Sequence, residues 1–187
     1  MTKALIFDCD GTLTNSMPVH YQAWRDVLDP LGVEFTQERF YGLAGVPGRG
    51  VLEHVAGDRF SATEVDSILE QREELFFGRI GEVEPITAVV EIVRQQHGKL
   101  PMAVASGSVR ESVHRQLDAL GIRDLFGAIV AAEDTERHKP EPDVFLEAAR
   151  RLDVPPEGCC VYEDSDLGIE AARRAGMAFV DVRPLYK

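Results

Sequence analysis

Two aspartates one residue apart, Asp8 and Asp10, follow the apolar segment 4–7 near the start of the chain. Carboxylates this close raise the cost of ionising each other, so their spacing needs a chemical reason. Side chains alternate along an extended strand, which places both aspartates on one side and Cys9 on the other. One aspartate can attack phosphorus while a second carboxylate handles the proton of the leaving group. The residues alone do not say which aspartate has which role.

Four more polar side chains come shortly after apolar segments in the same way. They are Ser106, Lys139, Glu163 and Asp164. The carboxyl ends of parallel strands meet at one edge of a sheet, and open α/β sheets bind their ligands at this edge. We therefore expect these side chains to lie beside the two aspartates in a single site.

The predicted site holds more negative charge than it can keep without a cation. Its carboxylates are Asp8, Asp10, Glu163 and Asp164. A divalent cation removes their repulsion, and a set of oxygen ligands favours Mg²⁺, which usually keeps waters and a substrate phosphate. Lys139 supplies a positive charge for the phosphate oxygens, and Ser106 with the backbone amide of Gly107 can donate to them. The implied reaction is phosphoryl transfer to or from a small phosphorylated substrate.

Five short apolar segments are predicted to be buried strands. They are residues 4–7, 102–105, 128–132, 159–162 and 178–182. Their continuous hydrophobicity is typical of parallel strands covered on both faces. Helical patterns at residues 108–120, 143–152 and 167–175 separate the last four, and the first of these opens with a capping-box pattern, Ser108 with Glu111. The alternation predicts a doubly wound parallel sheet, an α/β/α sandwich of Rossmann-like type.

The segment 16–84 interrupts this alternation, because it contains helical patterns and no convincing strand. One helix starts after the capping box of Ser61 and Glu64. Residues 87–97 then resume the α/β pattern. We expect an α/β core domain made of residues 1–15 and 85–187, and a helical cap domain made of residues 16–84.

The net charge, the cysteines and the lengths of the apolar runs argue against several classes of protein. The chain has 187 residues and a formal net charge of −12, which argues against nucleic acid as a partner because phosphate backbones are bound by Lys and Arg. Three cysteines without a Cys-x-x-Cys pattern predict neither a disulfide framework nor a zinc site. No apolar run approaches the roughly 20 residues of a membrane helix, and no signal-peptide pattern is present. We expect a cytoplasmic protein without a membrane partner, either a monomer or a weak dimer.

The polar residues together carry a family resemblance. The segments Asp8–Thr14 and Glu163–Gly168, with Ser106 and Lys139 between them, resemble the four-motif signature of the haloacid dehalogenase superfamily. The long gap after the first motif resembles the branch with a helical cap inserted there. Further segments are similar to the subgroup of fructose-1-phosphate phosphatases and beta-phosphoglucomutases. They are residues 18–25, 101–105, 138–145 and 171–176.

The resemblance implies a role for each residue of the signature. Asp8 would be the nucleophile that forms an aspartyl-phosphate, and Asp10 would protonate the leaving alcohol and then activate water. Mg²⁺ would be bound by Asp8, the backbone carbonyl of Asp10 and Asp164, with Glu163 as a direct or water-mediated ligand. The serine and the lysine of the signature would hold the phosphate. Dehalogenases of the superfamily lack the second aspartate, so Asp10 argues against their chemistry. Asn15, where many relatives are acidic, lies in the linker to the cap.

Residues of the predicted cap could recognise the rest of the substrate. His20 lies near the start of a helix, and Arg49 lies in the glycine- and proline-rich loop 44–50. The resemblance implies a place near the substrate for both, and Arg72 could do similar work. Asp166 is expected to be a helix N-terminal residue.

The sequence thus predicts a magnesium-dependent phosphatase that hydrolyses a small phosphomonoester, a sugar phosphate. The first alternative is a phosphosugar mutase of the beta-phosphoglucomutase type, because the core motifs do not separate return of the phosphoryl group to sugar from its transfer to water. The second alternative is a catalytically silent binding module. Two alternatives stay open for individual residues. Ser106 could be only the N-cap of a helix, and Glu163 could lie behind the Mg²⁺ ligands without binding the metal itself.

Overall fold

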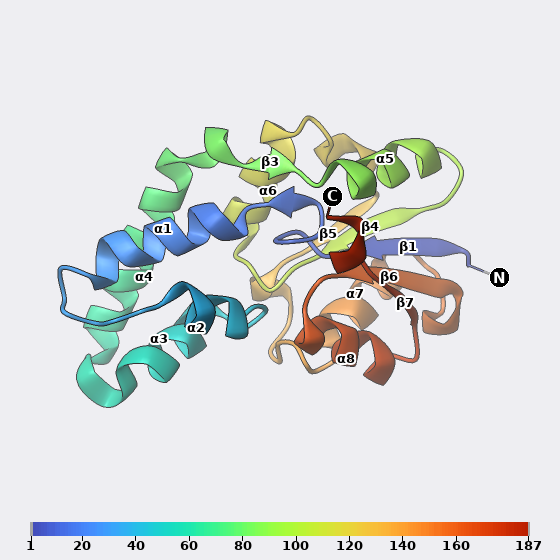
Figure 1. The fold of residues 1–187 in the computed structure, drawn as a ribbon. Coiled ribbons are helices and arrows are strands. Elements are labelled where there is room, and N and C mark those ends of the chain that lie inside the picture. Colours follow the sequence, from blue (N-terminus) through green and yellow to red (C-terminus); the bar gives the residue numbers. More distant parts are fainter. Residues whose placement is uncertain (1, 187) are drawn as a thin grey trace.

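A five-stranded parallel sheet forms the centre of the computed structural model, which describes residues 2–186 (Figure 1). Its strands are β1 (Ala4–Phe7), β4 (Met102–Ala105), β5 (Ala128–Val130), β6 (Cys159–Glu163) and β7 (Ala178–Asp181). Their spatial order is β5-β4-β1-β6-β7, so the chain starts in the middle and winds outward in both directions. Leu5 lies opposite Met102 on one side and Cys160 on the other. The doubly wound sheet predicted from the apolar segments is confirmed.

Helices cover both faces of this sheet, above and below the strands in Figure 1. They are α5 (Thr87–Gln96), α6 (Arg110–Ala119), α7 (Asp143–Arg151) and α8 (Asp166–Arg174). Leu5 and Phe7 of β1 pack in one apolar cluster with α5 and α6, and Ala4 and Ile6 pack in another with α7 and α8. Successive strand residues point to opposite faces, so a strand covered on both faces is apolar at every position.

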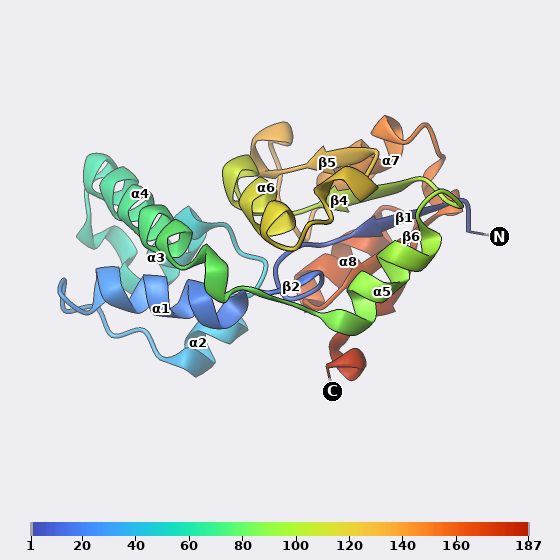
Figure 2. The same ribbon diagram turned by 90° about the horizontal axis from the view of Figure 1, so that it is seen from above.

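Four further helices form a separate layer beside the sheet, drawn in blue to green in Figure 2. They are α1 (Met17–Leu28), α2 (Gln37–Gly42), α3 (Gly48–Ala56) and α4 (Ala62–Gly78). Their facing sides bury an apolar cluster of their own, which includes Trp24, Phe35, Phe40, Leu52 and Ile68. This helical layer therefore has a core that does not depend on the sheet.

A short antiparallel ribbon lies where the chain enters and leaves the helical layer. Its strands are β2 (Thr14–Asn15) and β3 (Glu84–Pro85), with Thr14 opposite Pro85. The expectation of no strand within residues 16–84 misses the first residue of β3, because a two-residue strand leaves no periodicity in the sequence. We refer to β2 and β3 together as the hinge ribbon.

One of the two expected capping boxes is present. Ser61 caps α4 together with the residue three positions on, as predicted. The box expected from Ser108 and Glu111 is wrong, because α6 begins after Val109 without a side-chain cap. The Ser108 hydroxyl instead donates to a carboxylate oxygen of Asp10 at 2.6 Å. The Ser108 hydroxyl, which the local sequence pattern assigned to the end of α6, thus bonds Asp10 instead, a residue far away in the sequence.

Short 3-10 turns complete the described chain. They are Gly57–Arg59, Ile80–Glu82, Arg123–Leu125, Ala132–Asp134, Pro156–Gly158 and Arg183–Leu185. Among residues 2–186, no helix is both long enough and apolar enough to cross a bilayer.

Candidate active site

The ends of β1 and β6 and the loop after β5 bring three charged side chains into contact. Lys139 Nζ donates to Asp8 Oδ1 at 2.5 Å and to Glu163 Oε2 at 2.7 Å. The lysine side chain is 3% exposed, and those of Asp8 and Glu163 are 8% and 1% exposed. A buried charge is costly unless it is paired, so the ammonium and the two carboxylates depend on one another. The structure thus places these three predicted site residues together.

Asp8, Glu163 and Asp164 each offer an oxygen atom to a cluster whose members lie within 4.8 Å of one another. Burial raises the pKa of Asp8 well above its usual range; Lys139 opposes this shift and the neighbouring carboxylates reinforce it. Burial, with the charge of Glu163, raises the pKa of Asp164 to about 7. Carboxylates that resist ionising together fit a hard divalent cation that prefers oxygen ligands, as Mg²⁺ does. The Asp10 side chain lies outside this described cluster.

Two glycines leave room for the carboxylates of the cluster. A Cβ on Gly11, whose φ is +81°, would lie 2.2 Å from Asp164 Oδ2. The Thr12 hydroxyl donates to the other oxygen of Asp164 at 2.9 Å. On Gly168 in α8, a Cβ would lie 2.1 Å from the carboxylate of Glu163. The backbone therefore approaches both carboxylates more closely than any other residue type would allow.

The Asp10 carboxylate is held by hydrogen bonds from both sides of the site. Its Oδ1 accepts from Ser16 Oγ at 2.6 Å, His20 Nε2 at 2.8 Å and Gln116 Nε2 at 2.9 Å, and Ser108 donates to Oδ2. Burial alone would favour the neutral acid, but His20 and the hydroxyls hold the pKa of Asp10 well below its usual range. Sequence reasoning did not find the donors Ser16, Ser108 and Gln116, whose types are too common to stand out.

The contact with Arg72 determines which ring nitrogen of His20 carries the hydrogen. The Arg72 Nη1 lies 3.1 Å from His20 Nδ1, and arginine can only donate. Nδ1 therefore accepts, and the hydrogen of the neutral ring is on Nε2, where it donates to Asp10. The ring stacks on Phe76 at 3.9 Å, and Arg72 lies 5.1 Å from the centre of the Trp24 ring. Through His20, hydrogen bonds thus link Arg72 of the helical layer to Asp10.

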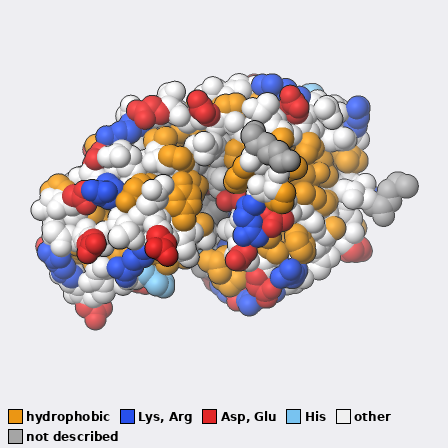
Figure 3. All heavy atoms as spheres, in the orientation of Figure 1, with side chains coloured by type: hydrophobic (Ala, Val, Ile, Leu, Met, Phe, Trp, Pro, Cys, Tyr) orange, Lys and Arg blue, Asp and Glu red, His pale blue; other side chains and the backbone are white. Residues whose placement is uncertain are grey.

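A cavity of about 370 Å³ lies between the carboxyl edge of the sheet and the helical layer. The face in Figure 3 is hollowed between these two parts. From the sheet side, Asp8, Asp10, Ser106, Gly107, Lys139, Glu163 and Asp164 line it. From the helical side come His20, Trp24, Phe40, Arg49, Leu69, Arg72 and Glu73. Its size suits a small molecule, with carboxylates and a lysine on the sheet side and a mixture of apolar and charged side chains on the helical side.

Ser106 and Gly107 occupy the turn between β4 and α6. The side chain of Ser106 is buried, and its Oγ accepts the backbone N–H of Ser108 at 3.0 Å. The backbone N–H of Ser106 donates to the carbonyl of Val130 in β5 at 3.0 Å. Since α6 begins after Val109, Ser106 is not its N-cap, and the residue is one of those that line the cavity.

Comparison with known proteins decides the family. The sequence pattern of haloacid dehalogenase-like hydrolases matches residues 5–182. The chain belongs to this family. The resemblance seen in the four motifs is therefore confirmed, and the expectation that the chain is an enzyme is confirmed with it.

The relatives of this haloacid dehalogenase-like hydrolase include proteins named as phosphatases and proteins named as phosphoglucomutases. It is 38% identical over 182 residues to the fructose-1-phosphate phosphatase YqaB of Escherichia coli, which covers 97% of this chain and 96% of YqaB. It is 29% identical over 191 residues to the beta-phosphoglucomutase of Bacillus subtilis, covering 96% and 83% of the two chains. The crystal structure of a beta-phosphoglucomutase from Clostridium difficile matches with a TM-score of 0.89 and 27% identity, over 97% and 84% of the chains.

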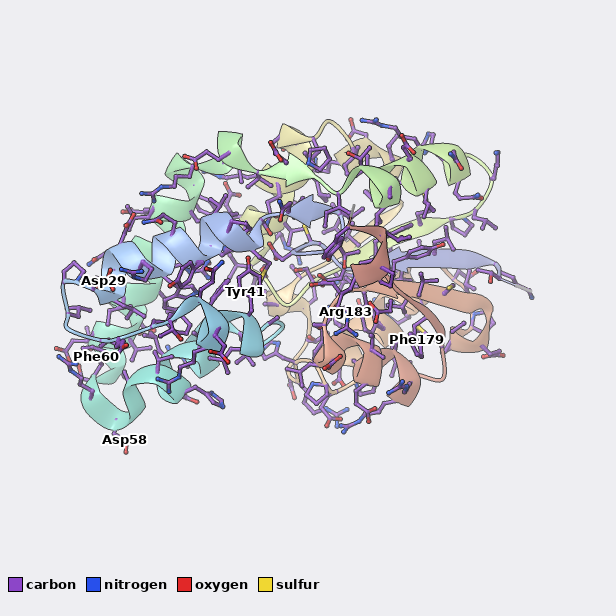
Figure 4. All side chains as sticks on the ribbon, in the orientation of Figure 1. Asp29, Tyr41, Asp58, Phe60, Phe179 and Arg183 are labelled. Atoms are coloured by element: carbon purple, nitrogen blue, oxygen red, sulfur yellow. The ribbon has the colours of Figure 1, made fainter. Side chains whose placement is uncertain are left out.

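Two further residues named from the sequence, Arg49 and Asp166, lie away from the carboxylate cluster of the hydrolase. Arg49 is in the first turn of α3 rather than in a loop; it lines the cavity, but its half-exposed guanidinium pairs with Asp66. Asp166 is the first residue of α8, as expected, and Arg183 Nη1 donates to it at 2.9 Å. Figure 4 shows Arg183 beside this helix.

Proposed function

We propose that the chain is a magnesium-dependent phosphatase that hydrolyses a sugar phosphate through an aspartyl-phosphate on Asp8. The observation that carries the proposal is the position of Asp8, which contacts Lys139 and shares a cluster with Glu163 and Asp164. A carboxylate in such surroundings could approach a phosphate dianion, because Lys139 and the Mg²⁺ that the cluster would hold would offset the repulsion between the two anions.

Each aspartate has a separate task in this reaction. An oxygen of Asp8 attacks phosphorus, the bond from phosphorus to the leaving oxygen breaks, and protonated Asp10 gives its proton to that oxygen. Ionised Asp10 then takes a proton from water, the water oxygen attacks the aspartyl-phosphate, and inorganic phosphate leaves. In the free site the hydrogen bonds to Asp10 favour its ionised form, so Asp10 must take up a proton as the substrate binds before it can act as the acid. The ionised form is the one that the second step requires.

The phosphate oxygens would be bound by Lys139, the Ser106 hydroxyl and the backbone N–H of Gly107, all of which line the cavity. Asp8, Glu163 and Asp164 would hold Mg²⁺, with the backbone carbonyl of Asp10. When bound, Mg²⁺ would supply positive charge against the phosphate oxygens. Lys139 also keeps Asp8 oriented, since its ammonium bonds one carboxylate oxygen of Asp8.

We further propose that residues 16–84 form a cap domain that closes over the substrate, with residues 1–15 and 85–187 as the core. The separate apolar cluster of α1 to α4 and the short hinge ribbon support this division. Closure would exclude bulk water and bring the helical side of the cavity against the leaving group. His20 and Arg72 line that side. The choice of a sugar phosphate as substrate is supported by the relative YqaB, which is named a fructose-1-phosphate phosphatase.

Charges on the helical side favour hydrolysis over the mutase alternative. Arg49 pairs with Asp66, and Arg72 Nη2 lies 2.8 Å from Glu73 Oε1. A mutase must bind a sugar bisphosphate whose second phosphate occupies the end of the cavity away from Asp8. Arginines that are already paired attract such a phosphate less than free cations would, which supports water as the final acceptor.

A panel of sugar and polyol phosphates, assayed for released phosphate with Mg²⁺ and with EDTA, tests the proposal. We expect Mg²⁺-dependent turnover that Asp8→Asn lowers about a thousandfold or more. Asp58→Asn, at an exposed position far from the cavity (Figure 4), is the matched control and should keep full activity. Full turnover by Asp8→Asn would refute the nucleophile. Conversion of glucose 1-phosphate to glucose 6-phosphate without phosphate release would establish the mutase instead.

A further inference from the structure

Gln116 is a fully buried glutamine in α6 that contacts the candidate active site from within the core. Its neighbours one turn before it and one position after it, Val113 and Leu117, belong to the apolar cluster between the sheet and the helices α5 and α6. Burying an amide among apolar groups costs about 1–3 kcal/mol unless its hydrogen bonds are made. A leucine or methionine at this position would avoid that cost, so the amide calls for an explanation.

The hydrogen bonds of Gln116 can have only one direction. Its Nε2 lies 2.9 Å from Asp10 Oδ1, and an ionised carboxylate can only accept. The amide oxygen must therefore face the other way, where Thr14 Oγ1 donates to it at 2.6 Å. Thr14 Oγ1 also lies 3.1 Å from the carbonyl of Cys9, but its single proton goes to the shorter contact. The resulting chain of donors runs from Thr14 through Gln116 to Asp10.

This series of hydrogen bonds begins on the hinge ribbon. Thr14 belongs to β2 and lies opposite Pro85 of β3, and its backbone carbonyl accepts from the N–H of Gly11 at 2.8 Å. The other donors to the same oxygen of Asp10 come from the helical layer and its entry: His20 is in α1, and Ser16 immediately precedes this helix. Gln116 is the donor to this oxygen that comes from α6, so it holds the carboxylate from the side of the sheet and its covering helices.

We propose that Gln116 is a positioning residue for Asp10, which fixes the carboxylate for proton transfer to the leaving oxygen and ties it to the hinge ribbon. The inference rests on the proposed role of Asp10 as the acid. Without the amide, one side of Oδ1 loses its donor and the carboxylate is free to rotate toward Ser16 and His20. Misplacing a catalytic group by about 1 Å can cost roughly 100-fold in rate.

Two substrates separate positioning of an acid from general damage to the fold. The leaving group of p-nitrophenyl phosphate departs as a stable anion and needs no proton, whereas the alkoxide of fructose 1-phosphate does. The value of kcat/KM reports the steps up to departure of the leaving group, so slow hydrolysis of the aspartyl-phosphate does not mask the effect. The measurement is therefore the ratio of kcat/KM for the two substrates.

Gln116→Met keeps the shape of the side chain and removes the amide. We expect it to lower kcat/KM for fructose 1-phosphate by about 10- to 100-fold and that for p-nitrophenyl phosphate by less than about threefold. Thr14→Val should shift the ratio in the same direction by a smaller factor, and it serves as the second variant should Gln116→Met not fold. Val113→Ala, which weakens the packing of α6 without touching Asp10, is the control and should leave the ratio unchanged.

Asp10→Asn shows whether a negative result concerns Gln116 or the proposed function. If Asp10→Asn shifts the ratio but Gln116→Met and Thr14→Val do not, Gln116 has only a structural role and the inference is wrong. If Asp10→Asn lowers kcat/KM for both substrates equally, the acid role of Asp10 is wrong and the inference fails with it. An equal loss on both substrates in Gln116→Met also overturns the positioning role.

Discussion

Lys139 illustrates how a single residue can serve stability and chemistry together. Its ammonium is almost completely buried, between Asp8 and Glu163. Burial opposes the charge, but the two carboxylates raise the pKa of Lys139 above its usual value. The positive charge is therefore maintained at any physiological pH, ready for a phosphate, and each partner would be left as an unpaired buried charge without it.

Replacing this lysine should consequently reduce stability as well as activity. We expect Lys139→Met to lower the free energy of unfolding by about 3 kcal/mol in EDTA, because it leaves buried carboxylates without their cation. Mg²⁺ should restore part of the loss, since it also neutralises the cluster. Urea unfolding with and without Mg²⁺ measures both effects. Lys99→Met, at an exposed turn, should change stability by less than about 0.5 kcal/mol. Wild-type stability of Lys139→Met in EDTA would contradict this account.

At the scale of elements, Glu163 is held by the two residues that lead into α8 and cap it. Glu163 Oε1 accepts from the backbone N–H groups of Asp164 and Ser165 at 3.1 and 2.9 Å and from the Ser165 hydroxyl at 2.8 Å. Ser165 in turn caps α8 by accepting from the N–H of Gly168 at 3.0 Å. Because Gly168 has no side chain, the carboxylate lies directly against the helix. The helix end and the candidate metal ligand thus form one unit.

A methyl group at this contact should therefore disturb the site more than the helix. Gly168→Ala would place its Cβ 2.1 Å from Glu163, so the carboxylate must move. We expect a loss of phosphatase activity of about 100-fold or more, and weaker binding of Mg²⁺ measured by calorimetry. Gly78→Ala is the matched control, because the exposed last residue of α4 has no heavy atom within 4 Å of the new Cβ. It should leave activity intact; unchanged Mg²⁺ binding in Gly168→Ala would refute the argument.

At the scale of the whole molecule, the carboxylate cluster joins strands that are far apart in the sequence. Asp8 follows β1, whereas Glu163 ends β6 and Asp164 follows it, and these strands are neighbours at the centre of the sheet. A cation bound there would favour the folded chain, because the unfolded chain does not hold the three carboxylates together. Metal binding and global stability should then be linked.

Mg²⁺ should accordingly raise the thermal unfolding midpoint of the wild type, with a gain in free energy of about 2.7 kcal/mol at 100 times its dissociation constant. We expect Asp164→Asn to lose most of this increment, as followed by calorimetric melting against Mg²⁺ concentration. Asp166→Asn should keep it, because Asp166 is paired with Arg183 and lies outside the cluster. An equal increment in both variants would place the metal elsewhere.

The sequence alone was sufficient for the sheet, the helices that cover it and the residues at its carboxyl edge. Apolar runs, helical spacing and signature motifs are local patterns, and the parallel topology then brings the strand ends together. The surroundings of Asp10 were decided only by the tertiary structure. Gln116 lies 106 positions away from it, and one glutamine in a helix carries no signal in the sequence. The same holds for Ser108, whose local pattern indicated a helix cap until a distant carboxylate offered a stronger acceptor.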